Sequence, residues 1–273
     1  MKDIDFKKEK FDIIILAGQS NAEGNGLCSP KEQYFNERVF ELTDDSVAVY
    51  GYGDIAYETH TSFPIDNARY RINDHRVSAD LSEMFAEKYI ESGLLAKDRK
   101  ILIVKAAVGG TGFSLKQWGT ENPLHCRLCD MTDYALSLNK ENRLVAFLWH
   151  QGEHDAFEQA SLTPTEREKF YHDNFKATLE DIRTRYGAKE LPVICGEFAD
   201  SWADKFKDAT SAVETASEKV CQEIGNAAMV KSEGLLSNAQ VIDWSVDDIH
   251  FCYESVLELG KRYFEKFKEI IER

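Results

Sequence analysis

Short apolar runs alternate along the chain with longer stretches in which apolar residues recur at helical spacing. Five of the short runs contain the β-branched residues and few of the polar residues that are typical of strands covered on both faces. These predicted strands are FDIIILAG from Phe11, ILIVKAAVGG from Ile101, RLVAFLWHQG from Arg143, LPVICGEF from Leu191 and AQVIDW from Ala239.

Four intervening stretches have the periodicity and the end signals of helices. A capping-box pair begins the stretch 80–93, and a threonine followed by proline begins the stretch 163–187. A third helix is predicted over 208–225, and a last one begins at about Glu254. Because strands and helices alternate, the pattern predicts an α/β fold with a mainly parallel sheet and helices on both sides.

Residues 30–79 do not fit this alternation. The string ERVFELTDDSVAVYG indicates a hairpin, and the loop after it is dense in aromatic side chains, which are Tyr52, Tyr57, His60, Phe63 and Tyr70. A loop of this length inside a compact domain is either functional or disordered. The chain has no repeat, low-complexity tract or clear linker, so we interpret residues 1–273 as a single domain with an aromatic-rich insertion at about 30–79.

Charge and hydropathy argue against nucleic-acid and membrane partners. The chain has 273 residues, a formal net charge of -15 and a pI near 5.0. An acidic surface repels phosphate backbones, so we expect no nucleic-acid partner. The opening MKDIDFKKEKFDIIILAG has too short an apolar run for a secretory signal, and no run approaches a membrane span of about 20 residues. We expect a cytoplasmic protein without a membrane partner; homo-oligomerisation stays open.

Cysteine and histidine spacing gives no metal site. Six cysteines in a chain of this length do not indicate a disulfide scaffold. Cys126 and Cys129 form one C-x-x-C motif without a second ligand pair, so we interpret them as ordinary thiols, with a redox role as the alternative. The string HQGEH fits a zinc-peptidase pattern that requires a helix, but here it follows a strand and contains Gly152. We expect no metal.

Polar residues follow four of the predicted strands. In open parallel sheets, ligands bind beyond the carboxyl ends of the strands, so these residues are expected to meet at one edge. The four segments are Gly18 to Asn21, Gly109 to Gly112, His150 to Asp155, and Asp243 to His250. Together they supply a serine, glycines, an amide, and an acid three residues before a histidine. This set of groups is typical of acyl transfer.

Each of these groups has a place in that chemistry. A serine hydroxyl such as Ser20 needs a base to take its proton, and His250 is the candidate. Asp247 is placed to orient the imidazole if the two lie in a turn, whereas Asp248, its rival, is expected to point away. The competing interpretations of Ser20 are a plain turn residue and a phosphate loop. The string GQSNAEGNG fits neither the G-x-G-x-x-G motif nor the G-x-x-x-x-G-K-[ST] motif of phosphate-binding loops, and no lysine follows it.

The negatively charged oxygen of a tetrahedral intermediate requires hydrogen-bond donors that already point at it. Three candidates follow from the strand ends: the backbone N–H of Ser20, the backbone N–H of Gly110 and the side-chain amide of Gln151. A glycine at position 110 lets the backbone approach a substrate closely.

With these residues in place, the chain resembles an SGNH/GDSL-type hydrolase, in the branch that contains sialate O-acetylesterases and acetylxylan-esterase-like proteins (carbohydrate esterase family 6). The resemblance rests on blocks in the family's order, namely GQSNAEGNG, AAVGGTGF, WHQGEHDA, DDIHF and LGKRYFEKF. They span residues 13 to 267. The resemblance implies a flavodoxin-like three-layer α/β/α sandwich, the SGNH hydrolase fold, and no cofactor.

The resemblance also implies roles for individual residues. Ser20 is then the nucleophile, His250 the base and Asp247 its partner, and Gly110 and Gln151 join Ser20 as oxyanion donors. We further expect residues beside this machinery to bind substrate or to hold the loops by hydrogen bonds, and they are Gln19, Asn21, Glu153, Asp155 and Trp118. We assign Trp118 to the acyl or sugar site, together with the aromatic loop 50–70. His154 stands where the family usually has a small residue, a departure that narrows the pocket or alters its charge.

The sequence thus predicts a serine esterase that removes O-acetyl groups from a carbohydrate through an acetyl-enzyme. The expected partner is a small acetylated carbohydrate: a xylo-oligosaccharide, a sialic acid or a related sugar. Two alternatives stay open. One is a short-chain ester hydrolase of non-carbohydrate substrates, and the other is a non-catalytic carbohydrate-binding protein on the same scaffold.

Overall fold

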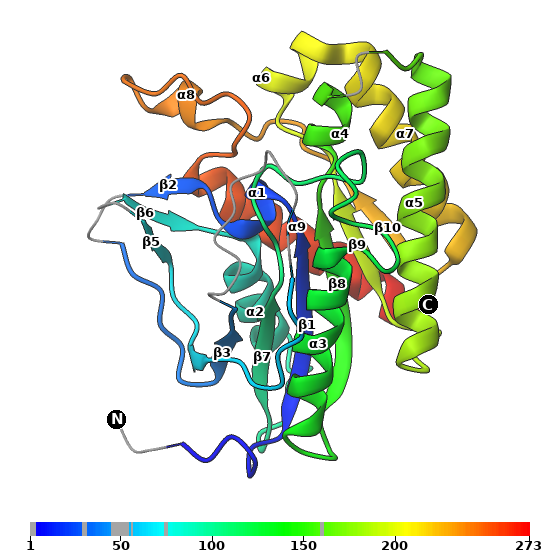
Figure 1. The fold of residues 1–273 in the computed structure, drawn as a ribbon. Coiled ribbons are helices and arrows are strands. Elements are labelled where there is room, and N and C mark those ends of the chain that lie inside the picture. Colours follow the sequence, from blue (N-terminus) through cyan, green and yellow to red (C-terminus); the bar gives the residue numbers. More distant parts are fainter. Residues whose placement is uncertain (1–3, 29–31, 45–54, 56, 74–75, 159–160) are drawn as a thin grey trace.

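The computed structural model describes residues 4–28, 32–44, 55, 57–73, 76–158 and 161–273. Figure 1 shows a central sheet with helices on both faces and a smaller sheet at one side. The second half of the hairpin predicted around residue 45 lies outside the described residues, as does Tyr52 of the aromatic loop.

The central sheet is seven-stranded and mainly parallel, in the order β10-β9-β8-β1-β7-β3-β4. Only the edge pair β3 and β4 is antiparallel among the pairs described. The strands are β1 (Phe11–Gly18), β3 (Val39–Leu42), β4 (Ile65–Asn67), β7 (Lys100–Lys105), β8 (Arg143–His150), β9 (Val193–Gly196) and β10 (Ala227–Val230).

Strand β1 lies at the centre of this sheet. After β1 the chain forms β3, β4 and then β7 on one side, and afterwards β8, β9 and β10 on the other, so the direction of winding changes at β1. The order β7-β1-β8-β9-β10 is that of a flavodoxin-like sheet, and β3 and β4 extend it beyond β7. A change of winding leaves a crevice beyond the carboxyl ends of β1 and β8, where such folds bind ligands.

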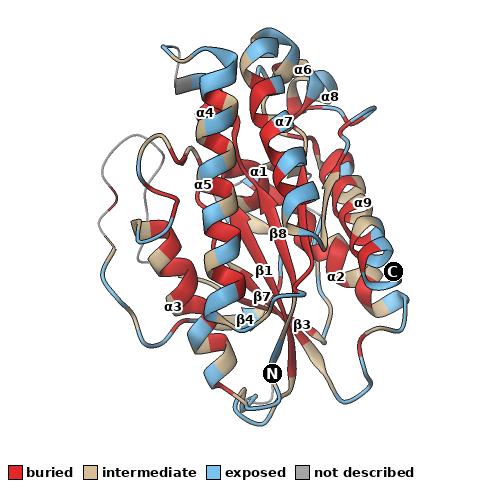
Figure 2. Cartoon of the chain, turned by 90° about the vertical axis from the view of Figure 1, so that its right-hand side faces the viewer, coloured by how far each residue is buried: buried red, intermediate tan, exposed pale blue. Residues whose placement is uncertain are grey.

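Alternate residues of β1 face two separate hydrophobic cores. Ile13 and Ile15 pack in one core with residues of α3 (Pro123–Ser137), α5 (Pro164–Arg185) and α7 (Lys207–Ile224). Ile14 and Leu16 pack in the other with residues of α2 (Leu81–Glu91) and α9 (Tyr253–Ile271). The sheet is buried in Figure 2, whereas α5 and α9 carry exposed residues along one side. The expected three-layer α/β/α arrangement is confirmed.

Four short helices gather at the carboxyl end of the central sheet, at the top of Figure 1. They are α1 (Ser20–Glu23), α4 (Glu153–Glu158), α6 (Asp200–Ala203) and α8 (Asn238–Val241), and a 3-10 turn, Asp204–Phe206, follows α6. A three-stranded antiparallel sheet packs nearby, composed of β2 (Gly26–Cys28), β6 (Arg76–Ala79) and β5 (Arg71–Asn73). Within the described ranges, we find no helix with the length and apolarity that a bilayer crossing requires.

Two strand predictions need correction. AQVIDW is not a strand, because Ser237 and Gln240 form a capping box that begins helix α8 there. The sheet's last strand is β10 instead, which pairs only with β9. The hairpin prediction is wrong for its first strand, because β3 pairs in parallel with β7 and in antiparallel with β4, which lies beyond the aromatic loop.

A carboxylate lies fully buried at the start of β1. Asp12 is 0% exposed, and its two oxygens accept hydrogen bonds from the guanidinium groups of Arg99 and Arg143 and from the hydroxyl of Tyr89. Burial raises the pKa of Asp12, but these hydrogen bonds outweigh it and hold the pKa below its usual value. The group links β1, α2, the loop before β7 and β8 at the end of the sheet opposite the crevice.

Candidate active site

The carboxyl end of β1 turns sharply into α1 and presents a serine at the turn. Gly18 has a φ of +128°, and a Cβ there would lie 2.1 Å from the carbonyl oxygen of His150. Only glycine fits, because a side chain would meet backbone of the neighbouring strand. The N–H of Gln19 donates to that same carbonyl at 2.9 Å, and Ser20 begins the helix. The turn therefore fixes Ser20 beside the end of β8.

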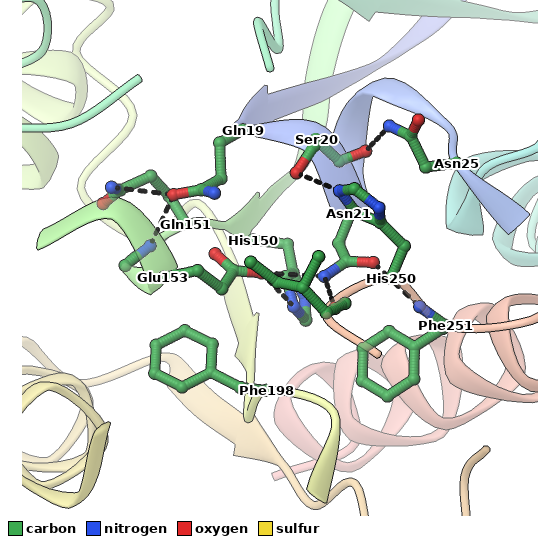
Figure 3. Close-up of polar contacts among 12 residues, drawn as sticks. Gln19, Ser20, Asn21, Asn25, His150, Gln151, Glu153, Phe198, His250 and Phe251 are labelled. Carbon is green, nitrogen blue, oxygen red and sulfur yellow. Dashed lines mark hydrogen bonds and ion pairs between the residues drawn. The ribbon is translucent and has the colours of Figure 1, made fainter. Parts of the chain in front are cut away.

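Ser20, His250 and Asp247 form a continuous hydrogen-bonded chain. The Ser20 Oγ lies 2.8 Å from Nε2 of His250 (Figure 3). The Nδ1 of that imidazole lies 2.9 Å from Oδ2 of Asp247. The backbone N–H of His250 also donates to Oδ1 of Asp247, at 3.2 Å. A hydroxyl, an imidazole and a carboxylate in this order are the parts of a serine nucleophile with its base.

The surroundings keep Asp247 ionised. Burial raises its pKa, but the hydrogen bonds from His250 and Asn238 outweigh burial, and the pKa lies below its usual value. The side-chain amide of Asn238 donates to Asp247 Oδ2 at 2.9 Å. Its rival Asp248 points away, since its carboxylate pairs with Lys205. An ionised Asp247 is the form that orients and stabilises an imidazolium.

Asn21 ties the loop that carries the base to the helix that carries the nucleophile. Its amide nitrogen donates to the carbonyl of Ile249 at 3.1 Å, and its amide oxygen accepts the N–H of Phe251 at 3.1 Å. The same nitrogen donates to Oε1 of Glu153 at 2.8 Å (Figure 3). These bonds grip the backbone on both sides of His250, so the base is positioned without a substrate.

Beneath this network the polar groups are uncharged or held by hydrogen bonds. Burial lowers the pKa of His150 to about 3, so its imidazole is neutral, and its Nδ1 lies 2.9 Å from the hydroxyl of Tyr263. Burial also raises the pKa of Glu153, against the effect of the Asn21 hydrogen bond. His150 lies in strand β8 and His154 in helix α4, so the HQGEH histidines do not share the helix face that a zinc-peptidase site needs.

The glycine loop after β7 lies against the serine. Gly110 has a φ of +68°, and its neighbour Gly109 donates its N–H to Glu23 at 3.0 Å. Asp155 holds the far side of the loop, because its carboxylate accepts the N–H groups of Phe113 and Ser114. Within the described part of the chain, the N–H groups of Ser20 and Gly110 donate to no protein acceptor, and both residues line the pocket. They are free to bind an oxyanion.

Gln151 does not reach the pocket as expected. Its amide nitrogen donates to Asp155 at 2.7 Å, to the carbonyl of Thr111 at 3.1 Å and to Gln19 at 3.3 Å. Three acceptors around one amide nitrogen leave no hydrogen for a substrate oxygen. The assignment of Gln151 as an oxyanion donor is therefore corrected: its amide holds the glycine loop, Gln19 and Asp155 together.

A pocket of about 400 Å³ opens over Ser20, and most of its surface is apolar. One wall of the pocket is aromatic and consists of Phe157 and Trp202. Both rings pack against Phe206, with centroids 5.6 Å and 5.4 Å from its ring. The lining consists of Gln19, Ser20, Glu23, Asn25, Gly109, Gly110, Glu153, His154, Phe157, Trp202, Ile249 and His250. His154, for which the resemblance led us to expect a small residue, is thus part of the pocket lining.

The described residues of the predicted aromatic lining do not line this pocket, while residues 50–54 and 56 of that loop lie outside the described residues. Trp118 is 0% exposed and donates its indole N–H to the hydroxyl of Thr111, so it packs beneath the glycine loop and does not touch the pocket. Among the described aromatics of residues 57–70, Phe63 and Tyr70 pack against Tyr134 and Tyr253 instead. Phe157 and Trp202 were missed, because only the tertiary fold brings α4 and α6 together above Ser20.

The candidate metal ligands lie elsewhere. In the described segments, the groups close enough to share an ion are His125, Cys129 and Asp181, on α3 and α5. Burial raises the pKa of the Cys129 thiol to about 12 and also raises that of Cys126, so both members of the C-x-x-C motif are protonated thiols near neutral pH. These values oppose a redox role for the pair.

Comparison with known proteins yields a family and a set of solved structures. The family described as "Carbohydrate esterase, sialic acid-specific acetylesterase" matches residues 10–269. The structure of NanS is similar with a TM-score of 0.73 and 19% identity, over 97% of this chain and 99% of that chain. A protein from Arabidopsis thaliana is similar with a TM-score of 0.68 and 17% identity, over 95% and 98% of the two chains.

A carbohydrate acetylesterase from Xanthomonas citri is similar with a TM-score of 0.61 and 14% identity, over 95% of this chain and 56% of that one. The search of curated proteins returned no match. At these identities the solved structures establish the fold.

Proposed function

The chain belongs to the carbohydrate esterase family of sialic acid-specific acetylesterases and is a carbohydrate O-acetylesterase, and on that premise we propose that it acts as a serine esterase through an acetyl-enzyme. The observation that carries this proposal is the hydrogen-bonded chain from Ser20 through His250 to Asp247, with contacts of 2.8 Å and 2.9 Å. The hydrogen-bonded chain opens into a pocket of about 400 Å³. The backbone N–H groups of Ser20 and Gly110 lie in the same pocket and donate to no acceptor among the described residues.

In the first half-reaction, Ser20 Oγ attacks the acetyl carbonyl carbon as its proton passes to Nε2 of His250. The carbonyl π electrons move to oxygen, and the N–H groups of Ser20 and Gly110 donate to that oxyanion. The carbonyl re-forms as the bond to the sugar oxygen breaks, and that oxygen takes the proton from His250. The sugar leaves with a free hydroxyl, and the acetyl group stays on Ser20.

The second half-reaction repeats these steps with water. His250 takes a proton from a water molecule as the water oxygen attacks the acetyl carbon. The N–H groups of Ser20 and Gly110 again donate to the oxyanion. Collapse breaks the bond to Ser20, whose oxygen recovers the proton from His250. Acetic acid is released and ionises to acetate. The ionised Asp247 stabilises the imidazolium formed in each half-reaction.

The substrate proposal rests on the shape of the pocket. The mostly apolar pocket suits a small acyl group, and the exposed ring of Phe157 offers a flat face for a sugar ring. An acetate-release assay with O-acetylated sialic acids, xylo-oligosaccharides and amino sugars tests it. We expect release from at least one class. If only longer or non-carbohydrate esters are cleaved, the short-chain ester hydrolase is correct; if no ester is cleaved, the protein is a binding module.

Replacing Phe157 tests the sugar wall. Phe157 lines the pocket and is 49% exposed, so its ring can contact a bound sugar. We expect Phe157→Ala to raise KM for the best acetylated oligosaccharide about three- to ten-fold, the loss of one aromatic contact. KM for a small aryl acetate should rise by a smaller factor. Phe35→Ala, which removes a phenylalanine that is 70% exposed and does not line the pocket, is the control. Equal effects on both substrates would contradict this role.

A further inference from the structure

The side chain of Gln19 lies buried beside the nucleophile with one end fixed and the other free. Gln19 is 2% exposed and lines the pocket. Its amide oxygen accepts three N–H groups, from Gly152 at 3.3 Å, His154 at 3.1 Å and the Gln151 side chain at 3.3 Å. Within the described residues its amide nitrogen donates to no protein acceptor.

The three donors also determine which way the amide points. An amide oxygen accepts and an amide nitrogen donates, so only one orientation satisfies the backbone N–H groups of Gly152 and His154. Figure 3 shows the oxygen of Gln19 turned toward Gln151 and its nitrogen on the side that faces Ser20. The nitrogen is therefore held in place before any substrate binds, which is the condition for effective stabilisation of a developing charge.

We propose that the amide nitrogen of Gln19 is the third oxyanion donor, together with the N–H groups of Ser20 and Gly110. This inference rests on the proposed serine-esterase mechanism. As Ser20 Oγ bonds to the acetyl carbon, the carbonyl π electrons move to oxygen, and Gln19 donates one N–H to that oxygen without giving up the proton. Gln151 is a positioning residue, because its amide nitrogen donates to the amide oxygen of Gln19 and helps to hold that side chain in place.

Two substitutions of Gln19 separate its role as a donor to the oxyanion from its role as an acceptor for the neighbouring backbone. Gln19→Glu keeps an oxygen acceptor for the N–H groups of Gly152 and His154 but replaces the donor with a second oxygen. Gln19→Met is uncharged and removes both functions, so it controls for the new charge. Thermal unfolding of each variant shows whether the fold is kept. The matched control is Gln151→Met, which removes an amide from the same network without touching the pocket.

The readout is a pair of aryl esters that differ in one atom, an acetate and its thionoacetate, in which sulfur replaces the carbonyl oxygen. Sulfur is a weak acceptor, so an oxyanion donor accelerates the acetate far more than the thionoacetate. We expect both Gln19 variants to lower kcat for the acetate about 10²- to 10³-fold with little change in KM. The acetate-to-thionoacetate rate ratio should fall at least about ten-fold. Gln151→Met should slow both esters by the same factor.

A wild-type ratio in both Gln19 variants would overturn the inference and leave the proposed function intact. A fall in the ratio with Gln151→Met alone would also overturn it and return the role to that residue. Absence of Ser20-dependent hydrolysis of the acetate by the wild-type protein would overturn the proposed function, and the inference with it.

Discussion

Replacing Ser20 with alanine is expected to lower kcat for an acetyl ester by about 10⁴- to 10⁶-fold, because the proposed mechanism forms the acetyl-enzyme on this hydroxyl. His250→Ala should be comparably damaging, since Oγ of Ser20 lies 2.8 Å from Nε2 of that imidazole and has no other base in contact within the described part of the chain. The double variant should be no slower than either single variant, because members of a triad act as a unit.

The measurement is initial rate against acetyl ester concentration, with acetate release as a second detection. Asp248→Asn is the matched control, because this carboxylate lies two residues from His250 but pairs with Lys205 outside the pocket. Its rate should stay within a few-fold of wild type. A Ser20→Ala protein with wild-type turnover, or a phosphonate that labels a different residue, would show that the hydrogen-bonded chain is not the catalytic one.

Removing the buried carboxylate of Asp12 is expected to produce the largest loss of stability. Asp12→Ala leaves the Arg99 guanidinium, whose side chain is 11% exposed, without its carboxylate partner. Breaking a buried ion pair from one side costs about 3–5 kcal/mol of unfolding free energy. Arg143→Gln removes a partner that is 55% exposed and should cost much less. Urea unfolding curves measure both.

Acid should reduce this difference. Because the folded-state pKa of Asp12 is lowered, the carboxylate contributes stability that is fully present above the unfolded-state pKa of about 3.9. That contribution is lost as pH falls through the lower folded-state pKa. The gap in unfolding free energy between wild type and Asp12→Ala should therefore be constant near neutral pH and shrink below about pH 4. A gap that grows in acid would contradict this account.

Much of the fold follows from local patterns. The strands β1, β7, β8 and β9 are recognisable in the sequence as apolar runs, and the capping boxes at Asp80 and Thr163 mark the starts of two helices. Strand β10 was missed because AAMV is only four residues long and lies at the sheet edge, where pairing on one side suffices. AQVIDW was wrongly predicted to be a strand, because a run of apolar residues this short fits a single capped helical turn as well as it fits a strand.

The site divides in the same way. Motif spacing pointed to Ser20, Asp247 and His250, because the chemistry requires those residue types at strand ends. The direction of two neighbouring amides could not be predicted, since Gln19 and Gln151 have the same side chain and differ only in which groups surround it. Burial of Trp118 likewise depends on Trp149, which packs 5.1 Å away, ring to ring, and on no local feature of the sequence.

Asn21 has a consequence for inhibition. Because it secures the backbone on either side of the base from the residue next to the nucleophile, the reactive hydroxyl is ready in the resting protein. Small acylating or phosphonylating poisons should therefore inactivate it stoichiometrically with no glycan present. Adding deacetylated sugar should slow that inactivation only by blocking the entrance, and never accelerate it.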